Sequence, residues 1–509
     1  MVLGDQLDRH GGVLKDAAPQ QDAILMVESR ALLKAGPIHA QKATLFMAAM
    51  RHLAQALEAE GFTVHYLPHD HEAANDFGAA AAATLKTYGY ARLHLMDPND
   101  RGVSGLIQAA TEAAGATFVP HASDRFMTDD ATFDRWAHGK KTLRMEGFYR
   151  VVRKQTGLLM EADGTPEGGQ FNFDQANRER PPKDRTPPEA VGFEPDEITA
   201  GVIREVQAWD HAWGDAAPFR WPVTRAQALE VLAHFCEDRL ADFGRYQDAM
   251  LTDQPLMWHS LLSVPLNMGL LHPREVVDAA IAERGRRAGT DREIPLNSLE
   301  GFVRQVIGWR EFMHHVDRVR GAELRQENHL EAQQPLPPAY WTGETDLNCL
   351  KTSLAHVRER GYAHHIERLM VLGNIGQLAG VQPEALLDWF MATHVDALDW
   401  VMVPNVMGMS QYADGGRMTS KPYAAGANYI HKMSDACASC RFDPKGKGDD
   451  ACPLTDWYWA FIDRHDARLQ GNPRMGVIRS AWQKRDEGVK DQVRERAAVT
   501  LQAFTDGTL

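Results

Sequence analysis

Four cysteines carry the clearest chemical pattern in this chain. Cys437, Cys440 and Cys452 form a C-x2-C-x11-C-P run, and Cys349 lies far upstream. Thiolates are soft ligands that suit zinc and iron–sulfur clusters, and both accept four cysteines. The run lies in a loop rich in Asp, Lys and Gly, where unligated thiols have no packing role. We therefore expect a metal or cluster ligand set that ties the C-terminal segment to an earlier helix.

Two adjacent histidines, His364 and His365, form a second pattern. They lie in an expected helix whose apolar face includes Leu369 and Met370. Neighbours on a helix point about 100° apart, so both cannot easily bind one metal. The separation favours one imidazole that faces a pocket and another that braces it. A pair of structural histidines is the alternative. The fifth cysteine, Cys236, lies in an apolar helical run and is expected in the core.

Composition places the chain among globular proteins with more than one domain. It has 509 residues, of which 44% are hydrophobic, and no apolar run is long enough to span a bilayer. No secretory leader is evident, so we expect a cytoplasmic protein with reduced cysteines. The net charge of −14 argues against nonspecific coating of nucleic acid, although a local basic surface remains compatible with it.

The elements that position these residues fall into two kinds. Apolar runs at residues 23–28, 63–67, 92–96 and 117–119 alternate with helical stretches such as 44–60. This alternation predicts a parallel sheet covered by helices over residues 1–130, with a ligand at the carboxyl ends of the strands. Residues 131–199 are expected to be a linker region, rich in Gly and Pro from 164 onward, and residues 200–509 an all-helical domain. The fold class is α/β plus all-α.

Several motifs resemble one known family. Residues 168–178 read G-G-Q-F-N-F-D-Q-A-N-R, similar to the G-G-x-W-N-F-D-x-x-N-R segment of a divergent prokaryotic branch of the photolyases and cryptochromes. Residues 304–312 read R-Q-V-I-G-W-R-E-F, which resembles that family's flavin-binding R-x-x-x-x-W-R-E-F signature. With the histidine pair and the cysteine set, the resemblance narrows to bacterial (6-4) photolyases and cryptochrome relatives that carry an iron–sulfur cluster.

The resemblance implies three cofactors. The helical domain would bind FAD, the cysteines a 4Fe-4S cluster, and the N-terminal domain a 6,7-dimethyl-8-ribityllumazine antenna. The expected flavin contacts are Tyr246, His259, Ser260, Leu261, Leu262, Ser263, Glu300, Gln305, Arg310, Asp396, Asp399 and Asn405. The expected antenna contacts are Asp5, Gln6, Glu28 and Phe46.

The resemblance also implies roles in electron and proton transfer. Trp389 would lie next to the flavin and Trp341 near the surface exit. Phe390 stands where relatives tend to have Tyr or Trp, and Phe carries a hole poorly, so hopping would run directly from Trp389 to Trp341. His365 would act as the acid toward a (6-4) lesion and His364 as its support.

UV-damaged DNA is the implied substrate of a monomer. The expected contacts are Arg178, Arg180, Lys183, Arg185, Lys421, Tyr423 and Tyr429. The first hypothesis is light-driven repair of (6-4) photoproducts by electron transfer from reduced FAD. The second is a cryptochrome-type photoreceptor that regulates gene expression through a signalling partner. A zinc-stapled helical protein without flavin is the third, and a colourless purified chain would favour it.

Overall fold

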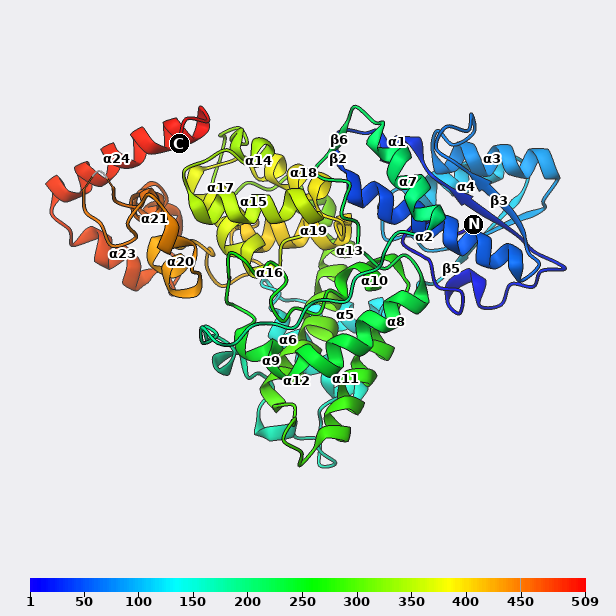
Figure 1. Ribbon diagram of the computed structural model, residues 1–509, viewed down its shortest axis with the longest axis horizontal. Helices are drawn as coiled ribbons and strands as arrows, with labels where there is room; N and C mark the ends of the chain where they lie inside the picture. Colours follow the sequence, from blue (N-terminus) through cyan, green and yellow to red (C-terminus); the bar gives the residue numbers. More distant parts are fainter. Residues whose placement is uncertain (449) are drawn as a thin grey trace.

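The computed structural model describes residues 1–448 and 450–509. Its ribbon has three lobes (Figure 1): an N-terminal lobe in blue, a lower lobe of cyan and green helices, and a C-terminal lobe that runs from orange to red. Yellow and green helices join them at the centre. In the described part of the chain, no helix combines the length and apolar character needed to cross a bilayer.

The N-terminal lobe is built on parallel strands, as the alternating pattern predicted. Each main strand ends within two residues of a predicted run, and they are β1 (Ala23–Val27), β3 (Thr63–Leu67), β4 (Arg92–Met96) and β5 (Thr117–His121). β1 pairs with β3, and β4 pairs with β5. Val2 bridges to Met26, and the Met1 amino group donates to the carbonyl oxygen of His94 at 2.8 Å. The first residues of the chain therefore lie between the two strand pairs.

Helices cover both faces of these strands, because successive strand residues point to opposite sides. Leu25 and Val27 pack with one group of helices, whereas Ile24 and Met26 pack with the other. This lobe contains η1 (Gly12–Leu14), α1 (Arg30–Leu33), α2 (Ala40–Ala59), α3 (Phe77–Tyr88), α4 (Val103–Ala113) and α7 (Glu197–Gln207).

The expected linker is more ordered than the sequence indicated. Residues 131–199 contain most of α5 (Asp130–Ala137) and all of α6 (Met145–Thr156), which bury Phe133 and Phe148 in the main core. Only short turns follow in the Gly- and Pro-rich part, namely η2 (Glu167–Gly169) and η3 (Asp174–Ala176). The predicted end of strand structure before residue 200 was also wrong. β6 (Ala212–Trp213) pairs with β2 (Ile38–His39), so a piece of the later chain returns to the N-terminal lobe.

Beyond residue 224 the described chain is helical, as predicted. Its elements are α8 (Arg225–His234), η4 (Phe235–Arg239), α9 (Leu240–Tyr246), α10 (Ser263–Met268), α11 (Pro273–Arg287), α12 (Leu296–Val303), η5 (Arg304–Arg310), α13 (Glu311–Leu324), α14 (Ala339–Thr342), α15 (Asn348–Arg360), α16 (His365–Glu367), η6 (Arg368–Gly373), α17 (Asn374–Ala379), α18 (Pro383–Thr393), α19 (Asp399–Met402), η7 (Val403–Ser410), α20 (Ala427–Met433), η8 (Ala436–Ser439), α21 (Pro453–Arg464), α22 (Asp466–Leu469), α23 (Gly476–Gln483) and α24 (Glu487–Thr505).

π-helical segments interrupt this region at η4, η5, η6 and η7. A π turn redirects the side chains that follow it, and such turns are frequent at functional sites. η5 ends at Arg310 of the predicted flavin signature, η6 begins at Arg368, and η7 contains Asn405.

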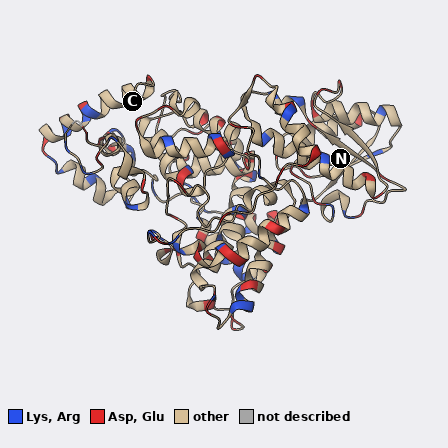
Figure 2. Ribbon diagram, in the orientation of Figure 1, with Lys and Arg blue, Asp and Glu red and all other residues tan. Residues whose placement is uncertain are grey.

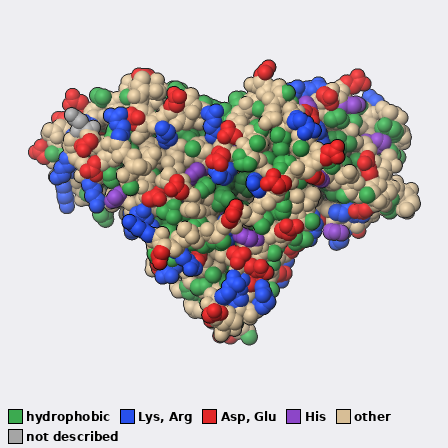
Figure 3. Space-filling view, in the orientation of Figure 1, with side chains coloured by type: hydrophobic (Ala, Val, Ile, Leu, Met, Phe, Trp, Pro, Cys, Tyr) green, Lys and Arg blue, Asp and Glu red, His purple; other side chains and the backbone are tan. Residues whose placement is uncertain are grey.

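Charge is mixed over the whole molecule. Figure 2 shows basic and acidic residues on all three lobes, and Figure 3 shows that the same mixture reaches the surface of this face. The net charge of −14 therefore does not come from one acidic lobe. Any basic surface for DNA must be local.

Candidate functional site

The cysteine set comes together in the tertiary structure. Cys349 is the second residue of α15, Cys437 lies in η8 with Cys440 just beyond it, and Cys452 caps α21. All four are free, and they line one cavity together with Leu347, Ala427, Ile430, Ala436, Phe442 and Leu454. The fold therefore brings the upstream cysteine to the three downstream ones in an apolar enclosure.

The spacing of the sulfur atoms separates the two ligand hypotheses. A tetrahedral zinc ion with sulfurs about 2.3 Å away would hold each pair of sulfurs about 3.8 Å apart. In the described chain, which includes all four cysteines, no three of these sulfurs lie within 4.8 Å of one another. The wider spacing fits a cluster of several metal ions better than a closed site for one zinc ion.

The thiols of this set need a positive partner to ionise. Burial raises the pKa of Cys437 to about 11, and Cys440 adds to the shift. Burial also raises the pKa of Cys452 to about 12. These thiols are protonated at pH 7 unless a metal stabilises the thiolate. The set therefore has the properties of a ligand site rather than of reactive cysteines.

A buried ion pair forms the centre of a second site. The Arg368 guanidinium donates to both carboxylate oxygens of Asp396, at 2.9 and 3.1 Å. The Ser263 hydroxyl donates to the same carboxylate at 2.7 Å, and the Asn267 side chain donates to the Asp396 carbonyl oxygen at 2.9 Å. We call these four residues the Arg368–Asp396 cluster. It links α10, η6 and the segment before α19.

Histidines near this cluster have unused hydrogen-bonding atoms. The His364 ring stacks on that of His259 with centroids 4.5 Å apart, and His394 lies two residues before Asp396. His364 Nδ1, His259 Nε2 and His394 Nε2 are all buried without a hydrogen-bond partner. Buried polar atoms in native proteins are nearly always paired. Three unpaired nitrogens in one region therefore indicate a place for a bound polar group.

The two adjacent histidines occupy different environments. His364 precedes α16 and is 1% exposed, whereas His365 begins that helix and is exposed. Burial by the surrounding protein nevertheless lowers the pKa of His365 to about 4, with Arg368 as the second cause. Both observations agree if the ring faces a recess rather than the open surface. His365 is thus neutral at pH 7 in this state.

Arg310 of the flavin-type signature makes its contacts elsewhere. Its guanidinium donates to the carbonyl oxygen of Arg125 at 3.0 Å and lies 4.4 Å from the centre of the Phe126 ring and 5.1 Å from that of Trp400. These contacts hold the segment after β5 against α13. The structure therefore does not bring Arg310 into the Arg368–Asp396 cluster.

Three further predicted flavin contacts form hydrogen bonds or pack with other residues of the protein. The fully buried Glu300 carboxylate accepts from Tyr149 at 3.0 Å and from the Phe173 amide at 3.1 Å, which fastens the linker to α12. The Gln305 amide donates within its own helix, to the Gly301 carbonyl oxygen. Tyr246 packs with Met257 and Trp258 in a small separate core. The structure does not join these residues to the Arg368–Asp396 cluster.

The remaining predicted flavin contacts bond with other groups of the protein or have unusual backbone geometry. Ser260 accepts from the Leu262 amide at 3.3 Å, and Leu261 between them has φ of 59°, a left-handed conformation that is strained for leucine. Asp399 pairs with Arg325 at 2.8 Å. Asn405 donates to the Val401 carbonyl oxygen at 2.8 Å.

Aromatic rings connect this region to the surface. Trp389 is fully buried, 5.7 Å from His394 and 5.1 Å from Tyr340 between ring centroids. Trp341 follows Tyr340 in the chain, and its ring lies 5.8 Å from that of Trp213. Both outer tryptophans are partly exposed.

These rings offer a second route beside the expected direct path from Trp389 to Trp341. Phe390 lies 5.1 Å from Trp389, as expected for its neighbour, but Tyr340 offers an oxidisable ring on the other side. Sequence reasoning missed both Tyr340 and Trp213. Tyr340 directly precedes Trp341, which was a usable signal, whereas Trp213 lies on β6 and only the fold brings it close.

The predicted antenna residues make different contacts within the N-terminal lobe. Asp5 accepts from Asn99 at 3.3 Å, and the Gln6 amide donates to the Met96 carbonyl oxygen at 3.1 Å. Phe46 packs directly on Gly4, beside these two. The carboxylate of Glu28 is instead held by Arg51, Tyr66 and the amide of His69. Val2 bridges to Met26 in parallel, and two residues further along lie Gly4 and Glu28, so Glu28 remains close to the other predicted contacts.

Part of the predicted DNA surface is already neutralised by acidic neighbours. Arg178 pairs with Asp174, and Arg185 pairs with Asp242. The remaining predicted cations, Arg180, Lys183 and Lys421, are exposed. Burial raises the pKa of Tyr429 and Arg178 partly offsets that rise, so this arm lies near α20. Tyr423 is also partly buried and within the field of Arg178.

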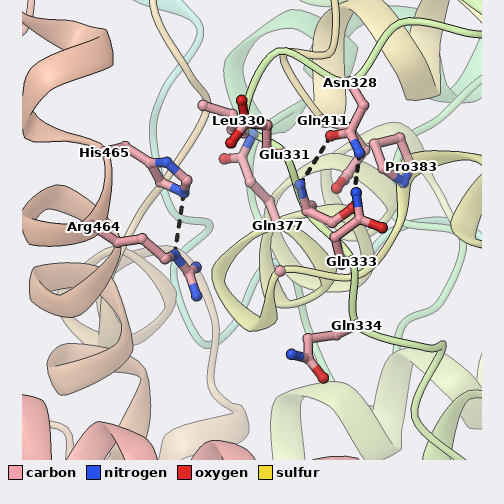
Figure 4. Close-up of a pocket in the computed structure, with 12 residues that line it drawn as sticks. Asn328, Leu330, Glu331, Gln333, Gln334, Gln377, Pro383, Gln411, Arg464 and His465 are labelled. Atoms are coloured by element: carbon pink, nitrogen blue, oxygen red, sulfur yellow. Dashed lines mark hydrogen bonds between the residues drawn. The ribbon is translucent and has the colours of Figure 1, made fainter.

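A separate polar pocket opens beyond η7 (Figure 4). It has a volume of about 180 Å³, and Gln411 forms part of its wall. Figure 4 shows Gln377, Gln333 and Asn328 on one side and Arg464 with His465 on the other. This volume is below the range of about 300–1,000 Å³ that is typical of small-molecule pockets.

Comparison with known proteins gives a consistent picture. A family model described as "Deoxyribodipyrimidine photo-lyase-related protein" matches residues 1–221. A protein of Agrobacterium fabrum named (6-4) photolyase is 39% identical over 504 residues, which cover 98% of each chain.

Solved structures with the same fold have lower sequence identity. A bacterial class III photolyase from Agrobacterium tumefaciens matches with a TM-score of 0.58 at 16% identity, over 96% of this chain and 93% of that one. A cryptochrome from Synechocystis sp. PCC6803 also matches with a TM-score of 0.58, at 13% identity, over 85% of this chain and 86% of that one. At these identities the likeness concerns the fold alone.

Proposed function

The chain belongs to the photolyase and cryptochrome family, and from this premise we propose that it repairs (6-4) pyrimidine–pyrimidone photoproducts in DNA under blue light. The observation that carries the proposal is the 39% identity to a (6-4) photolyase across 98% of both chains. The family predicted from the motifs is thereby confirmed. The reaction breaks the carbon–carbon bond between two bases, so the chain is a DNA-repair lyase.

Residues around the Arg368–Asp396 cluster fit a bound FAD. The unpaired ring nitrogens of His259, His364 and His394 offer polar contacts in a buried region. Ser260 lies just before α10 and Ser263 begins it, and both can contribute hydroxyl groups. The chemistry that reduced FAD would supply here is light-driven transfer of one electron to the lesion, with return of that electron after the bond between the bases breaks.

The protein's own contribution is electrostatic. Arg368 keeps a fixed positive charge beside the proposed flavin, and Asp396 orients it through two hydrogen bonds. The Ser263 hydroxyl already donates to Asp396, which ties the start of α10 to this pair. A preorganised arrangement of this kind needs no rearrangement when charge moves.

We assign His365 as the proton donor to the lesion and His364 as the residue that holds His365 in position. His364 is stacked on His259, which fixes the backbone from which His365 projects. Because the pKa of His365 is lowered to about 4 by burial, the ring donates a neutral N–H at pH 7. It delivers a proton only when an anionic group of the bound lesion raises that pKa. General-acid catalysis of this kind contributes about 10²- to 10⁴-fold in rate.

DNA would approach on the face that contains Tyr423 and Tyr429. The lesion must leave the duplex to reach His365, and damage lowers the cost of unstacking. Lys421 and the arm from Arg178 to Arg185 supply the phosphate contacts. Phosphates must compete with the acidic partners of Arg178 and Arg185, so these two contribute less than the free cations. We propose that the chain acts on DNA as a monomer in the cytoplasm.

The cysteine set would hold a 4Fe-4S cluster that staples the C-terminal lobe to α15. The sulfur spacing and the apolar enclosure support this assignment over zinc. The lumazine antenna would lie by Asp5, Gln6 and Phe46, where the unpaired Gln6 Oε1 and the half-buried Asp5 offer polar contacts. Such an antenna would pass absorbed light energy to the flavin.

The proposal is tested by repair of an oligonucleotide with a single (6-4) photoproduct. The purified protein, with its flavin reduced, is illuminated with blue light, and the products are separated by chromatography. We expect the intact dipyrimidine to appear in the light and not in the dark. His365→Ala should abolish repair with flavin and lesion binding retained, whereas His10→Ala, at an exposed site in the N-terminal lobe, should have no effect.

A photoreceptor of the cryptochrome type is the second candidate. The observation that favours it is the neutral state of His365, because a signalling protein needs no proton donor at that place. If reduced and illuminated wild-type protein leaves the (6-4) oligonucleotide unchanged, the repair proposal fails and this candidate takes its place.

A further inference from the structure

Two histidines of α13 and one aspartate of α5 converge at the junction between the N-terminal lobe and the helical core. We propose that Asp130, His314 and His315 form a binding site for a single transition-metal ion of the zinc class. Adjacent residues on a helix point about 100° apart, but here the two rings turn toward a common point: one oxygen of Asp130 and one ring nitrogen of each histidine all lie within 4.8 Å of one another. This site is separate from the cysteine set and from the Arg368–Asp396 cluster.

The distances suit one small cation. His315 Nδ1 lies 3.5 Å from Asp130 Oδ1. Two ligand atoms at about 2.0–2.1 Å from a tetrahedral zinc ion stand about 3.3 Å apart. The observed separation is close to that value and is too long for a good hydrogen bond between the two groups. The pair is therefore spaced for an ion between them.

The hydrogen bonds around His315 leave its Nδ1 atom available to bind a metal ion. Thr128 has one hydroxyl proton, and it donates to the Glu311 carboxylate at 2.6 Å. The Thr128 oxygen must then accept from His315 Nε2, which lies 2.9 Å away. In a neutral ring with the proton on Nε2, Nδ1 carries a bare lone pair. That atom is buried, has no partner, and faces Asp130.

The same residues form the support that metal ligands need. A ligating histidine usually donates its other ring N–H to a partner that fixes its tautomer and orientation. Thr128 has that role here, and Glu311 in turn orients Thr128 while it accepts from the amides of residues 127 and 128. The ring of His315 also stacks on Phe133, with centroids 4.9 Å apart. The free nitrogen is therefore held in place before any ion arrives.

The other two ligands are held by neighbours and remain accessible. The His314 ring stacks on Phe126 with centroids 3.5 Å apart. The Asp130 side chain is 60% exposed, which opens a path from solvent. Arg318 contacts the same carboxylate at 2.9 Å and also pairs with Asp134. It can keep its bond to Asp134 when Asp130 binds the ion, and a ligating carboxylate commonly accepts a hydrogen bond as well.

The ligand types indicate the class of ion. Two imidazole nitrogens with one carboxylate suit zinc and its first-row neighbours better than magnesium or calcium, which prefer oxygen ligands. Three protein ligands leave a fourth position for water. An ion here would cross-link the start of α5 to the N-terminal part of α13. Its effect would be to stabilise the segment that leads from the N-terminal lobe into the helical core.

The test is zinc binding by calorimetry to the protein with its cofactors, after treatment with a chelator mild enough to leave the cluster absorbance unchanged. We expect one zinc ion per chain in the wild type. Asp130→Asn and His314→Gln should each weaken binding at least tenfold. Asp134→Asn is the matched control, because Asp134 lies on the same helix and pairs with the same Arg318 but is not a ligand.

Thermal unfolding with and without zinc distinguishes a lost metal site from a variant that does not fold. Added zinc should raise the thermal midpoint of the wild type and of Asp134→Asn, and should leave that of Asp130→Asn unchanged. Thr128→Val keeps all three ligands and removes only the support of His315, so it should weaken zinc binding about 10- to 100-fold. Equal zinc affinity in the wild type and His314→Gln, or no zinc binding in the wild type, would overturn the proposal.

Discussion

Replacing Arg368 by Met tests whether the Arg368–Asp396 cluster organises the proposed flavin site. Methionine keeps much of the length of arginine and none of its charge. The Asp396 side chain is 6% exposed and would be left with Ser263 as its one side-chain donor. Removing one partner of a buried ion pair costs about 3–5 kcal/mol, because an uncompensated charge stays behind. We expect the apparent free energy of unfolding to fall by about that amount.

The double variant R368M/D396N separates the lost charge from the lost packing. Asparagine at 396 carries no charge and can still accept the Ser263 hydrogen bond. Most of the loss should therefore be recovered, and the two changes should couple by about 2–3 kcal/mol instead of adding. Arg325→Met is the matched control. Arg325 also pairs with an aspartate, Asp399, but both side chains are about one-third exposed, so its loss should cost about 0–1 kcal/mol.

Urea unfolding at pH 7, followed by tryptophan fluorescence, measures these differences, and absorbance of the purified variants measures their flavin content. We expect Arg368→Met to retain less flavin than Arg325→Met. The reasoning is refuted if the two single variants unfold alike and both keep a full complement of flavin. It is also refuted if the loss of unfolding free energy in R368M/D396N equals the sum of the losses in R368M and in D396N.

Other predictions follow from the remaining sites. Cys437→Ala should lower the iron content and make the C-terminal lobe more sensitive to proteolysis, and stoichiometric zinc without iron in the wild type would contradict the cluster assignment. Trp389→Phe should slow blue-light photoreduction of the flavin strongly, and Tyr340→Phe should slow it too if the hole passes through that ring; wild-type rates in both would place the path elsewhere. Burial lowers the pKa of His39 to about 4 in the folded chain, whereas its pKa in the unfolded chain is about 6.5. Between these two pH values His39 binds a proton in the unfolded chain and not in the folded chain. Neutral His39 therefore contributes about 3 kcal/mol to the free energy of unfolding above pH 6.5, and this contribution is lost as the pH falls toward 4. His39→Asn can still cap α2 and should lose less stability over that pH interval.

Local patterns in the sequence predicted the strands and the helical character of the later chain. The apolar runs marked β1, β3, β4 and β5 to within two residues, because a strand buried between helices needs consecutive apolar side chains. They did not reveal α5 and α6 inside the supposed linker. Those helices form because Phe133 and Phe148 find a partner surface on the helical core, and that surface is distant in sequence.

The cysteine set and the family signatures could likewise be read from the sequence, since ligand type and spacing are local properties. The arrangement of residues around the proposed flavin site could not be predicted from the sequence. Arg368 reads as one more charge in H-H-I-E-R, and its partner Asp396 lies 28 residues away. Arg310 carries the recognised signature, yet its contacts run to the segment after β5.

The sequence by itself thus determined which residue types could bind metal or flavin and which elements would carry them. Only the tertiary structure decided which of them meet, because a buried charge or imidazole takes its role from the partners that desolvate it, and those partners come from distant parts of the chain. The free nitrogen of His315 is an example: Thr128 and Glu311 fix its tautomer, and Asp130 faces it.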